Sequence, residues 1–430
     1  IMEEAIGSQI ADYLIKPVKP NQILLAIKKI TENKKLISEK TATSYRQEFQ
    51  NIMTEVNNVN SHQEWAELYK KLIYWELELE KADNPDMKNI LDMQKSEANK
   101  EFFKFISKHY LKWLKEPGKE STPTLSHTLF KDKVMPAVSP GVPTFFILVD
   151  NLRYDHFKMM ETLIKEDFRK VSEDYFFSIL PTTTQYSRNA IFSGLMPLEI
   201  DKKYPEKWFY DDENAGKNLH EEFFLNEQFK NNRVQLKTSY TKITNHRSGK
   251  ELENTILNLM NNDFNVIVYN FVDMLSHART EMEVLKELAS DEAAYRSLTL
   301  SWFDHSPLLN ALQKLKEKKV RIVITSDHGT VRVQNPSKII GDKATTTNLR
   351  YKTGKNLNFN EKEVFFVKNP EEAFLPKSNL SSSYVFAKED YYFCYPNNYN
   401  HFVNYYRNTF QHGGVSIEEM IVPVAVFESK

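Results

Sequence analysis

The chain has 430 residues and carries 57 Lys and Arg against 58 Asp and Glu, a formal net charge of −1. At about 150 residues per domain, this length predicts two or three domains with ample chain for a buried core. The balanced charge excludes the overall basic character of a duplex-binding protein. Cys394 is the only cysteine, which excludes a disulfide framework and suits a reducing cytoplasm. The apolar runs are shorter than the roughly 18 residues that a membrane helix needs, so we expect no membrane span.

The first 33 residues are typical of the end of an α/β domain. A strand-like run at 11–15 is followed by Lys16 and Pro17, and residues 21–30 repeat apolar side chains at helical spacing. One strand and one helix cannot bury both their faces, so we expect the rest of that domain upstream. This order resembles the last strand and helix of a CheY-like receiver domain of a response regulator. The resemblance implies that Lys16 contacts a phosphoryl group, that the phosphoacceptor Asp lies outside this chain, and that a histidine kinase is a partner.

The segment 34–138 predicts a helical linker or bundle. It is rich in Glu, Lys, Gln and Asn, with apolar residues at helical intervals. Asn84-Pro85 and the Glu-Pro-Gly run at 116–118 predict two breaks between helices. A group of prolines then marks the start of a third domain, which we assign to 139–430.

Three apolar runs of this third domain each end in an aspartate: 145–149 before Asp150, 266–272 before Asp273, and 321–326 before Asp327. Continuous apolar runs are typical of strands buried on both faces, which predicts an α/β fold with a parallel-rich sheet between helices. A single aspartate at such a place is more often a helix cap. Three of them at the carboxyl ends of parallel strands predict a ligand site at one edge of the sheet.

Three histidines extend this pattern. His277 follows Asp273 by four residues, the spacing that puts both side chains on one face of a helix, and His328 directly follows Asp327. His412 precedes two glycines and a strand-like run at 420–427. Histidine and aspartate without cysteine, in two groups, predict two divalent cations, with Zn²⁺ as the first choice and Mn²⁺ as the alternative.

A run of three threonines supplies a possible nucleophile. Thr182, Thr183 and Thr184 follow Pro181, at the end of an apolar run and before a segment that can begin a helix at 186–192. Anions bind readily at helix N-termini. A threonine at this place can also be a simple helix cap. Beside six possible metal ligands, the run predicts a threonine nucleophile without deciding which of the three it is.

Four segments of the third domain together resemble a PglZ domain of the alkaline-phosphatase superfamily. They are VDNLRYD at 149–155, PTTTQYSRNAIFSGLMP at 181–197, SDHG at 326–329 and HGGVSIEEMIVPVAVF at 412–427. The resemblance covers about residues 140–430. The order of receiver, helical linker and PglZ domain is similar to that of a family of response regulators associated with type IX secretion.

The resemblance to the superfamily implies a nucleophile and two metal sites. The ligands implied for one metal are Asp273, His277 and His412, and those for the other are Asp150, Asp327 and His328 together with the nucleophile oxygen. The related Pro-Thr-x-Thr motif selects Thr184 as the nucleophile, with Thr182 and Thr183 as alternatives. The implied activity is that of a metal-dependent phosphodiesterase, and we expect short linear or cyclic oligonucleotides as substrates.

Further expectations concern the surroundings of this site. Positive charge for a substrate is expected from Arg153, Arg188, Lys343, Arg350 and Lys352. The polar segment 199–263 is expected to form a cap over the site. Phosphorylation of the receiver is expected to favour a homodimer. The alternative function is a catalytically silent, metal-stabilised output domain that binds a sigma factor or a secretion component.

Overall fold

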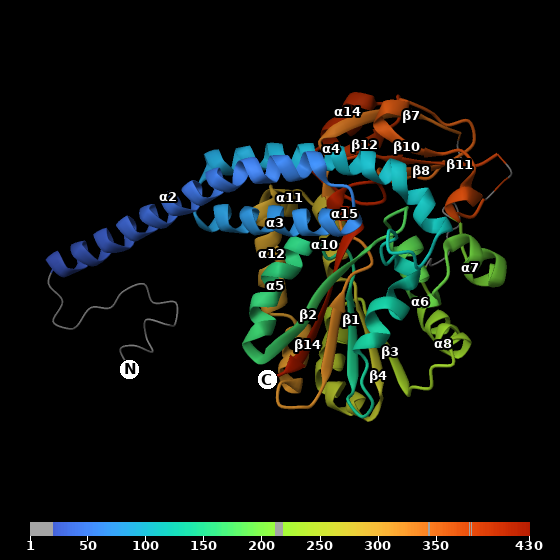
Figure 1. Cartoon of the computed structure of the whole chain (residues 1–430), viewed down its shortest axis with the longest axis horizontal. Helices are drawn as coiled ribbons and strands as arrows, with labels where there is room; N and C mark the ends of the chain where they lie inside the picture. Colours follow the sequence, from blue (N-terminus) through green and yellow to red (C-terminus); the bar gives the residue numbers. More distant parts are fainter. Residues whose placement is uncertain (1–19, 211–217, 343–344, 378, 380) are drawn as a thin grey trace. The chain divides into compact units, whose positions relative to one another are not determined.

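The computed structural model describes residues 20–210, 218–342, 345–377, 379 and 381–430 (Figure 1). The predicted strand at 11–15 and Lys16 lie outside the described residues. The chain divides into two compact units, the first comprising residues up to 59 with 67–98 and the second comprising 60–66 with 99–430. No helix among the described residues is both long and apolar enough to cross a membrane.

Among its described residues, the first unit contains three helices: α2 (Pro20–Asn58), α3 (His62–Lys81) and α4 (Pro85–Lys115). The last two also contribute residues to the second unit. Both predicted breaks, at Asn84-Pro85 and at 116–118, are confirmed. The helix α2 continues through the predicted domain boundary at 33 without a break. Residues 31–36 contain neither Gly nor Pro, so nothing there stops the helix.

The second unit contains a six-stranded sheet (Figure 1). Its strands are β1 (Thr144–Val149), β2 (Phe168–Phe177), β3 (Thr238–Ile243), β4 (Phe264–Tyr269), β5 (Arg321–Thr325) and β14 (Ile421–Ser429), in the order β2-β14-β5-β1-β4-β3. The strand β1 is parallel to β4 and β5, and β3 is parallel to β4. The strand β14 runs antiparallel to β2 and β5. The predicted α/β fold with a parallel-rich sheet is confirmed.

Helices cover both faces of this sheet, which explains the unbroken apolar run of β1. Phe145, Ile147 and Val149 pack into a core that α5 (Tyr154–Asp167), α9 (His246–Thr255), α10 (Phe271–Glu281), α12 (Glu292–Asp304) and α13 (Pro307–Leu315) help to form. On the other face, Phe146 contacts the rings of Phe130 and Phe192. All six residues of β1 are buried, so both faces of the strand contribute to the core.

The predicted cap at 199–263 is wrong for residues 238–261. Those residues form β3, α9 and a short 3₁₀ helix, η6 (Ile256–Asn261), and β3 is the last strand of the main sheet. Its sequence, TSYTKI, is polar because an edge strand remains partly exposed, and this composition concealed it. The rest of the segment contains α7 (Pro197–Lys203), η5 (Pro205–Lys207) and α8 (Glu221–Asn231).

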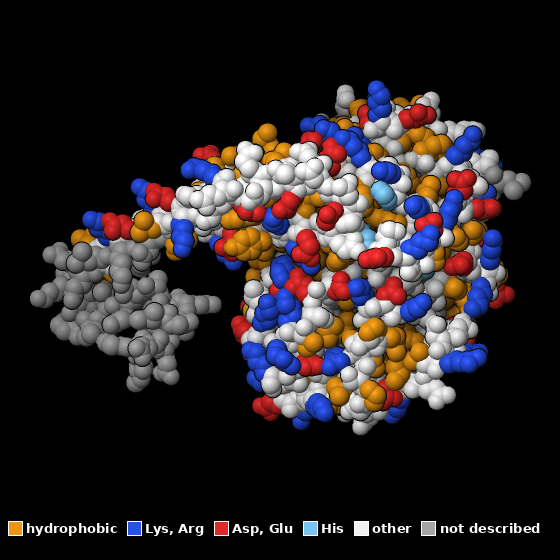
Figure 2. Space-filling model, viewed as in Figure 1, with side chains coloured by type: hydrophobic (Ala, Val, Ile, Leu, Met, Phe, Trp, Pro, Cys, Tyr) orange, Lys and Arg blue, Asp and Glu red, His pale blue; other side chains and the backbone are white. Residues whose placement is uncertain are grey.

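Smaller sheets follow β5 in the chain. Their strands are β6 (Val331–Arg332), β7 (Asn335–Ile340), β8 (Tyr351–Gly354), β9 (Asn358–Phe359), β10 (Val364–Val367), β11 (Ser383–Ala387), β12 (Tyr391–Cys394) and β13 (Phe410–Gln411). The remaining α-helices are α6 (Asn189–Ser193), α11 (Glu283–Leu288), α14 (Tyr399–Tyr406) and α15 (Ile417–Met420). On the face seen in Figure 2, cationic and acidic side chains are interspersed, as the balanced composition predicts.

Candidate active site

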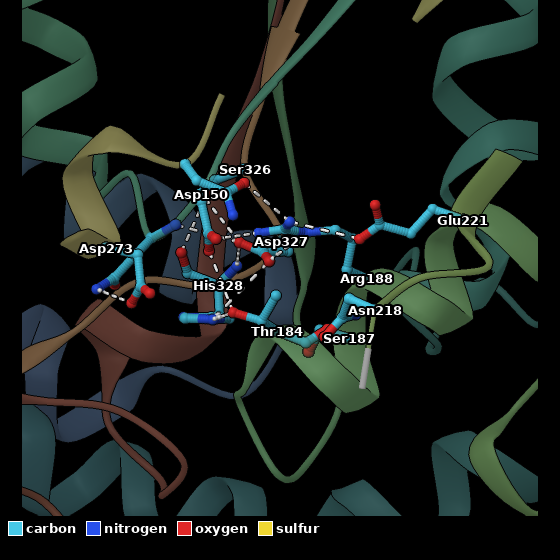
Figure 3. A network of polar contacts seen from close by, with 12 residues as sticks. Asp150, Thr184, Ser187, Arg188, Asn218, Glu221, Asp273, Ser326, Asp327 and His328 are labelled. Carbon is cyan, nitrogen blue, oxygen red and sulfur yellow. Dashed lines mark hydrogen bonds and ion pairs between the residues drawn. The ribbon is translucent and has the colours of Figure 1, made fainter. Parts of the chain in front are cut away.

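Two neighbouring parallel strands deliver three polar side chains to one place. Asp150 directly follows β1, and Asp327 and His328 follow β5 after Ser326. Each of Asp150, Asp327 and His328 offers a ligand atom, and these atoms lie within 4.8 Å of one another (Figure 3). All three residues are buried. The edge at which the strand ends meet therefore holds a group able to bind a cation.

The backbone around β1 fixes the Asp327 carboxylate. Asn151 has a positive φ of 61°, which asparagine tolerates better than most residues, and its N–H donates to Asp327 Oδ1 at 3.2 Å. The N–H of His328 donates to the same oxygen at 3.0 Å. Burial acts to raise the pKa of Asp327, but His328, Arg188 and these N–H groups outweigh burial and hold the pKa below its ordinary value. These contacts therefore favour the ionised form of the Asp327 carboxyl group.

Arg188 forms ion pairs with the carboxylates of both Asp150 and Asp327. Its side chain is buried, its guanidinium pairs with Asp150, and its Nε donates to Asp327 Oδ2 at 2.9 Å (Figure 3). Its Nη1 also lies 3.4 Å from Glu221 Oε1. Burial raises the pKa of Asp150 well above its ordinary value, Arg188 opposes this shift, and Asp327 and Asp273 add to it. The guanidinium of Arg188 thus pairs with several carboxylates, so Asp150 and Asp327 together carry more negative charge than it can neutralise.

Thr184 is the threonine that faces this group. Its Oγ1 lies 3.2 Å from Asp150 Oδ1 and 3.2 Å from His328 Nε2 (Figure 3). It begins a π-helical turn, η4 (Thr184–Arg188), which continues into α6. Thr182 is buried and donates to the carbonyl of Gly414 at 3.1 Å, and Thr183 is buried at the N-cap of η4. Of the three, Thr184 alone is partly exposed.

The two described histidines of the site, His328 and His412, each contact a backbone carbonyl through Nδ1. His328 Nδ1 lies 3.0 Å from the carbonyl of Gly329, and His412 Nδ1 lies 3.1 Å from the carbonyl of Thr182. A carbonyl only accepts, so Nδ1 carries a proton in both rings, and in the neutral imidazole the lone pair is then on Nε2. The rings stack with centroids 4.3 Å apart. Both histidines are thus in the tautomer that binds a metal through Nε2.

Asp273 reaches the site from a helix rather than from a strand end. The strand β4 ends at Tyr269 and α10 begins at Phe271, so the predicted strand 266–272 extends three residues past the end of β4. Asp273 lies in the first turn of α10, with its Oδ1 3.6 Å from His412 Nε2. Its spacing to His277 is helical, as expected, but the His277 side chain lies outside the described residues.

Most of the cations expected to bind a substrate are engaged elsewhere. The buried Arg153 pairs with Asp155 at 2.8 Å and with Glu292 at 2.6 Å. The buried Arg350 pairs with Glu419 at 2.6 Å. The buried Lys352 donates to the carbonyl of Thr346 at 2.7 Å. These three predictions are corrected, because a buried and paired cation cannot face a substrate. Lys343 lies outside the described residues.

Two residues of the site carried no signal in the sequence. Glu221 faces Arg188 and also pairs with Lys242 at 2.8 Å, and Asn218 Nδ2 donates to the carbonyl of Thr184 at 3.1 Å (Figure 3). Both belong to the segment 199–263, which is predicted to form a cap. Their partners are distant in the chain, so no local motif could reveal them.

The donor set fits a divalent cation. Two carboxylates and a histidine with a free Nε2 lone pair are typical zinc ligands, and three protein ligands are the usual number in a catalytic zinc site. Asp150 and Asp327 share one guanidinium, so a cation beside them would relieve the repulsion between the two carboxylates. Asp273 and His412 offer two more donors nearby.

Two solved structures illustrate the similarity of fold to known proteins. Murine ectonucleotide pyrophosphatase/phosphodiesterase 5 is 11% identical, with 66% of this chain and 87% of that chain covered and a TM-score of 0.46. Phosphonoacetate hydrolase from Sinorhizobium meliloti 1021, in complex with phosphonoformate, is 12% identical, with 67% and 90% covered and a TM-score of 0.42. No curated protein matches the sequence.

Two family models match successive parts of the chain. Residues 35–114 match the PorX response regulator linker domain. Residues 129–427 match the BREX system PglZ alkaline phosphatase-like domain, and this match includes every described residue that contributes a donor to the candidate metal sites. Because this second match spans more than half of the sequence, the chain belongs to the PglZ family of alkaline phosphatase-like domains.

Proposed function

We propose that this chain is the output part of a two-component response regulator and that its PglZ domain is a metal-dependent phosphodiesterase with Thr184 as the nucleophile. One observation carries the proposal. The Thr184 Oγ1 lies 3.2 Å from both Asp150 Oδ1 and His328 Nε2, which belong to the group able to bind a cation. A hydroxyl so placed becomes a nucleophile when a cation joins the group.

The residues of the site can be assigned to two divalent ions, most simply Zn²⁺, with Mn²⁺ as the alternative. The first would be held by Asp150, Asp327 and His328, and the second by Asp273, His412 and His277. When bound, such ions lower the pKa of a hydroxyl and offset charge on a phosphoryl group. Arg188 holds the carboxylates of Asp150 and Asp327 in place, and the carbonyls of Gly329 and Thr182 orient the two imidazoles.

The reaction follows from the place of the hydroxyl. The Thr184 oxygen forms a bond to phosphorus, the bond to the leaving alcohol breaks, and the hydroxyl proton passes through solvent to the departing alkoxide. Water then attacks the phosphothreonine, restores the hydroxyl and releases a phosphate monoester. Asn218 holds the Thr184 carbonyl through both steps, so the nucleophile keeps its position.

An aromatic pair beside the nucleophile supports nucleotide substrates. The rings of Phe209 and His220 are half-buried, with centroids 6.2 Å apart and planes 22° from parallel. Gln185, next to Thr184, donates to the carbonyl of Phe209. Aromatic side chains stack on nucleobases without reading their sequence. We therefore propose short linear or cyclic oligonucleotides as the substrate class.

The match of residues 35–114 to the PorX linker supports a place in response-regulator signalling. We propose that a histidine kinase phosphorylates a receiver preceding this linker, that phosphorylation favours a homodimer, and that the protein acts in the cytoplasm in the control of type IX secretion. In the alternative, the domain is catalytically silent and acts by binding a sigma factor or a secretion component.

The test is turnover of bis-p-nitrophenyl phosphate by the metal-loaded chain and by two matched variants. Thr184→Ala should reduce kcat at least about 1,000-fold, as removal of a covalent nucleophile does, with an unchanged melting temperature. Thr183→Ala should retain turnover, because the hydroxyl of Thr183 has no hydrogen-bond partner among the described residues. Turnover retained by Thr184→Ala would contradict the proposal. Absence of turnover in the metal-loaded wild type would favour the alternative.

A further inference from the structure

The short helix α15 contacts the segments that carry the two described histidines of the site. The carbonyl oxygen of Glu418 packs against Gly329, where a Cβ would lie only 2.0 Å from it, and Gly329 N–H donates to the carbonyl of Glu419 at 3.1 Å. Gly329 follows His328. The carboxylate of Glu419 accepts from the N–H of Gly414 at 2.8 Å, two residues after His412. A shift of α15 would therefore move both histidines.

The same helix is linked to the nucleophile turn. Thr182 Oγ1 lies 3.4 Å from Glu419 Oε1 and accepts from the N–H of Gly413 at 2.9 Å. Thr182 precedes Thr184 by two residues, and its carbonyl orients His412. The turn with the nucleophile and the loop with His412 are thus joined at Thr182.

Two polar residues of α4 hold these segments from outside. Asn99 Nδ2 donates to Glu418 Oε2 at 2.9 Å, and the N–H of Ile417 donates to Asn99 Oδ1 at 2.8 Å. The N–H of Leu180 donates to the hydroxyl of Tyr110 at 2.8 Å. Both Asn99 and Tyr110 are buried. Their separation of 11 residues is about three helical turns, so both lie on one face of α4.

We propose that Asn99 and Tyr110 are positioning residues that hold the Thr184 turn and the His412 loop in their working arrangement. The proposal rests on the proposed function for its effect on catalysis. Apolar side chains would suffice if α4 only packed against the domain, as Trp113 does against Phe177. Instead, Tyr110 accepts from the backbone just before the Thr184 turn, and Asn99 bonds to the backbone and side chain of α15, which contacts the segments with His328 and His412. They also fall within the match to the PorX linker, so that linker helix supplies part of the support of the catalytic site.

The first test is the kinetics of Tyr110→Phe and Asn99→Ala. Tyr110→Phe keeps the ring and leaves the buried N–H of Leu180 without its acceptor, which should displace the turn. We expect kcat to fall about tenfold in each variant while KM changes less than about twofold, because the change affects catalytic geometry rather than substrate contacts. The matched control, Trp113→Phe on the same helix, should lower the melting temperature and leave kcat unchanged.

The second test does not need turnover. Hydrogen–deuterium exchange of the metal-loaded chain should show amides of residues 180–184 exchanging at least about tenfold faster in Tyr110→Phe, and amides of 413–418 doing so in Asn99→Ala. Trp113→Phe should change neither segment. If the wild type proves inactive, faster exchange in the two variants would support the positioning role while the missing turnover contradicts the phosphodiesterase. Unchanged exchange in both variants, or an equal loss of kcat in Trp113→Phe, would overturn the inference.

Discussion

Two buried clusters of arginine and aspartate follow β1 within a few residues of each other. In the first, Asp150 and Asp327 share the guanidinium of Arg188. In the second, Asp155 accepts from Arg153 Nε at 2.9 Å and from Arg296 Nη1 at 3.0 Å. The residue types and the degree of burial are the same. The charges differ, because the second cluster has two guanidinium groups where the first has one.

The pKa values of the two aspartates reflect this difference. Burial acts to raise the pKa of Asp155, but Arg153, His156 and Arg296 outweigh burial and hold the pKa well below its ordinary value. For Asp150 burial prevails, so the pKa is raised. Glu292 completes the second cluster by pairing with Arg153, so two carboxylates meet two cations. A balanced cluster holds the fold together, whereas a cluster short of positive charge is suited to binding a cation.

The sharpest test of this contrast is a pair of isosteric variants, Asp327→Asn and Asp155→Asn. Asp327→Asn removes a proposed metal ligand and should lower kcat/KM at least about 1,000-fold. Asp155→Asn removes the carboxylate that two buried guanidinium groups share and should lower the free energy of unfolding by about 3–5 kcal/mol. Turnover of bis-p-nitrophenyl phosphate and urea unfolding of both variants provide the two measurements.

The same two variants can also disprove the proposed difference between the two clusters. The metal-loaded Asp155→Asn variant should keep the metal content of the wild type as long as it is folded. Asp327→Asn should lose less stability than Asp155→Asn, because it also removes a repulsion with Asp150. Equal losses of stability in the two variants, with equal metal content, would show that charge balance does not distinguish the clusters.

Metal removal should abolish turnover, and its effect on stability should be smaller than that of Asp155→Asn. A cation that binds only the folded chain stabilises it by about 2.7 kcal/mol at a concentration 100 times its Kd. Treatment with a chelator should therefore lower the melting temperature of the wild type, and Zn²⁺ should restore it. The same treatment should shift the melting temperature of Asp327→Asn less, because that variant lacks a ligand of the first cation. If the chelator leaves the melting temperature of the metal-loaded wild type unchanged, this result would argue against a cation in the first cluster.

The sequence predicted the ends of β1 and β5 because a strand buried on both faces is a continuous apolar run. The strands β1 and β5 are continuous apolar runs, and each is followed closely by its aspartate. The strand β3 has no such run, since an edge strand can be polar. The helical start at Phe271 was missed because Phe271 and Val272 extend the apolar pattern of β4 into α10.

The roles of the arginines could not be predicted from local sequence. Arg153 and Arg188 both lie in motifs of the candidate site, yet their surroundings differ. Arg188 meets Asp327 across 139 residues of chain, and Asp155 meets Arg296 across 141. Such partners are set by the packing of α12 and the sheet. Whether a cation serves the site or the fold is therefore decided by tertiary contacts.

Lys352 extends the comparison to a buried cation for which the described residues provide no carboxylate partner. Burial lowers the pKa of Lys352 from 10.5 to about 7. Between these two values the unfolded chain binds a proton that the folded chain does not, so stability should rise with pH across this interval. The expected gain from pH 7 to pH 10, relative to Lys352→Met, is about 2–4 kcal/mol. Urea unfolding at several pH values measures it, and a difference between the two proteins that is constant with pH would show that Lys352 stays charged in the fold.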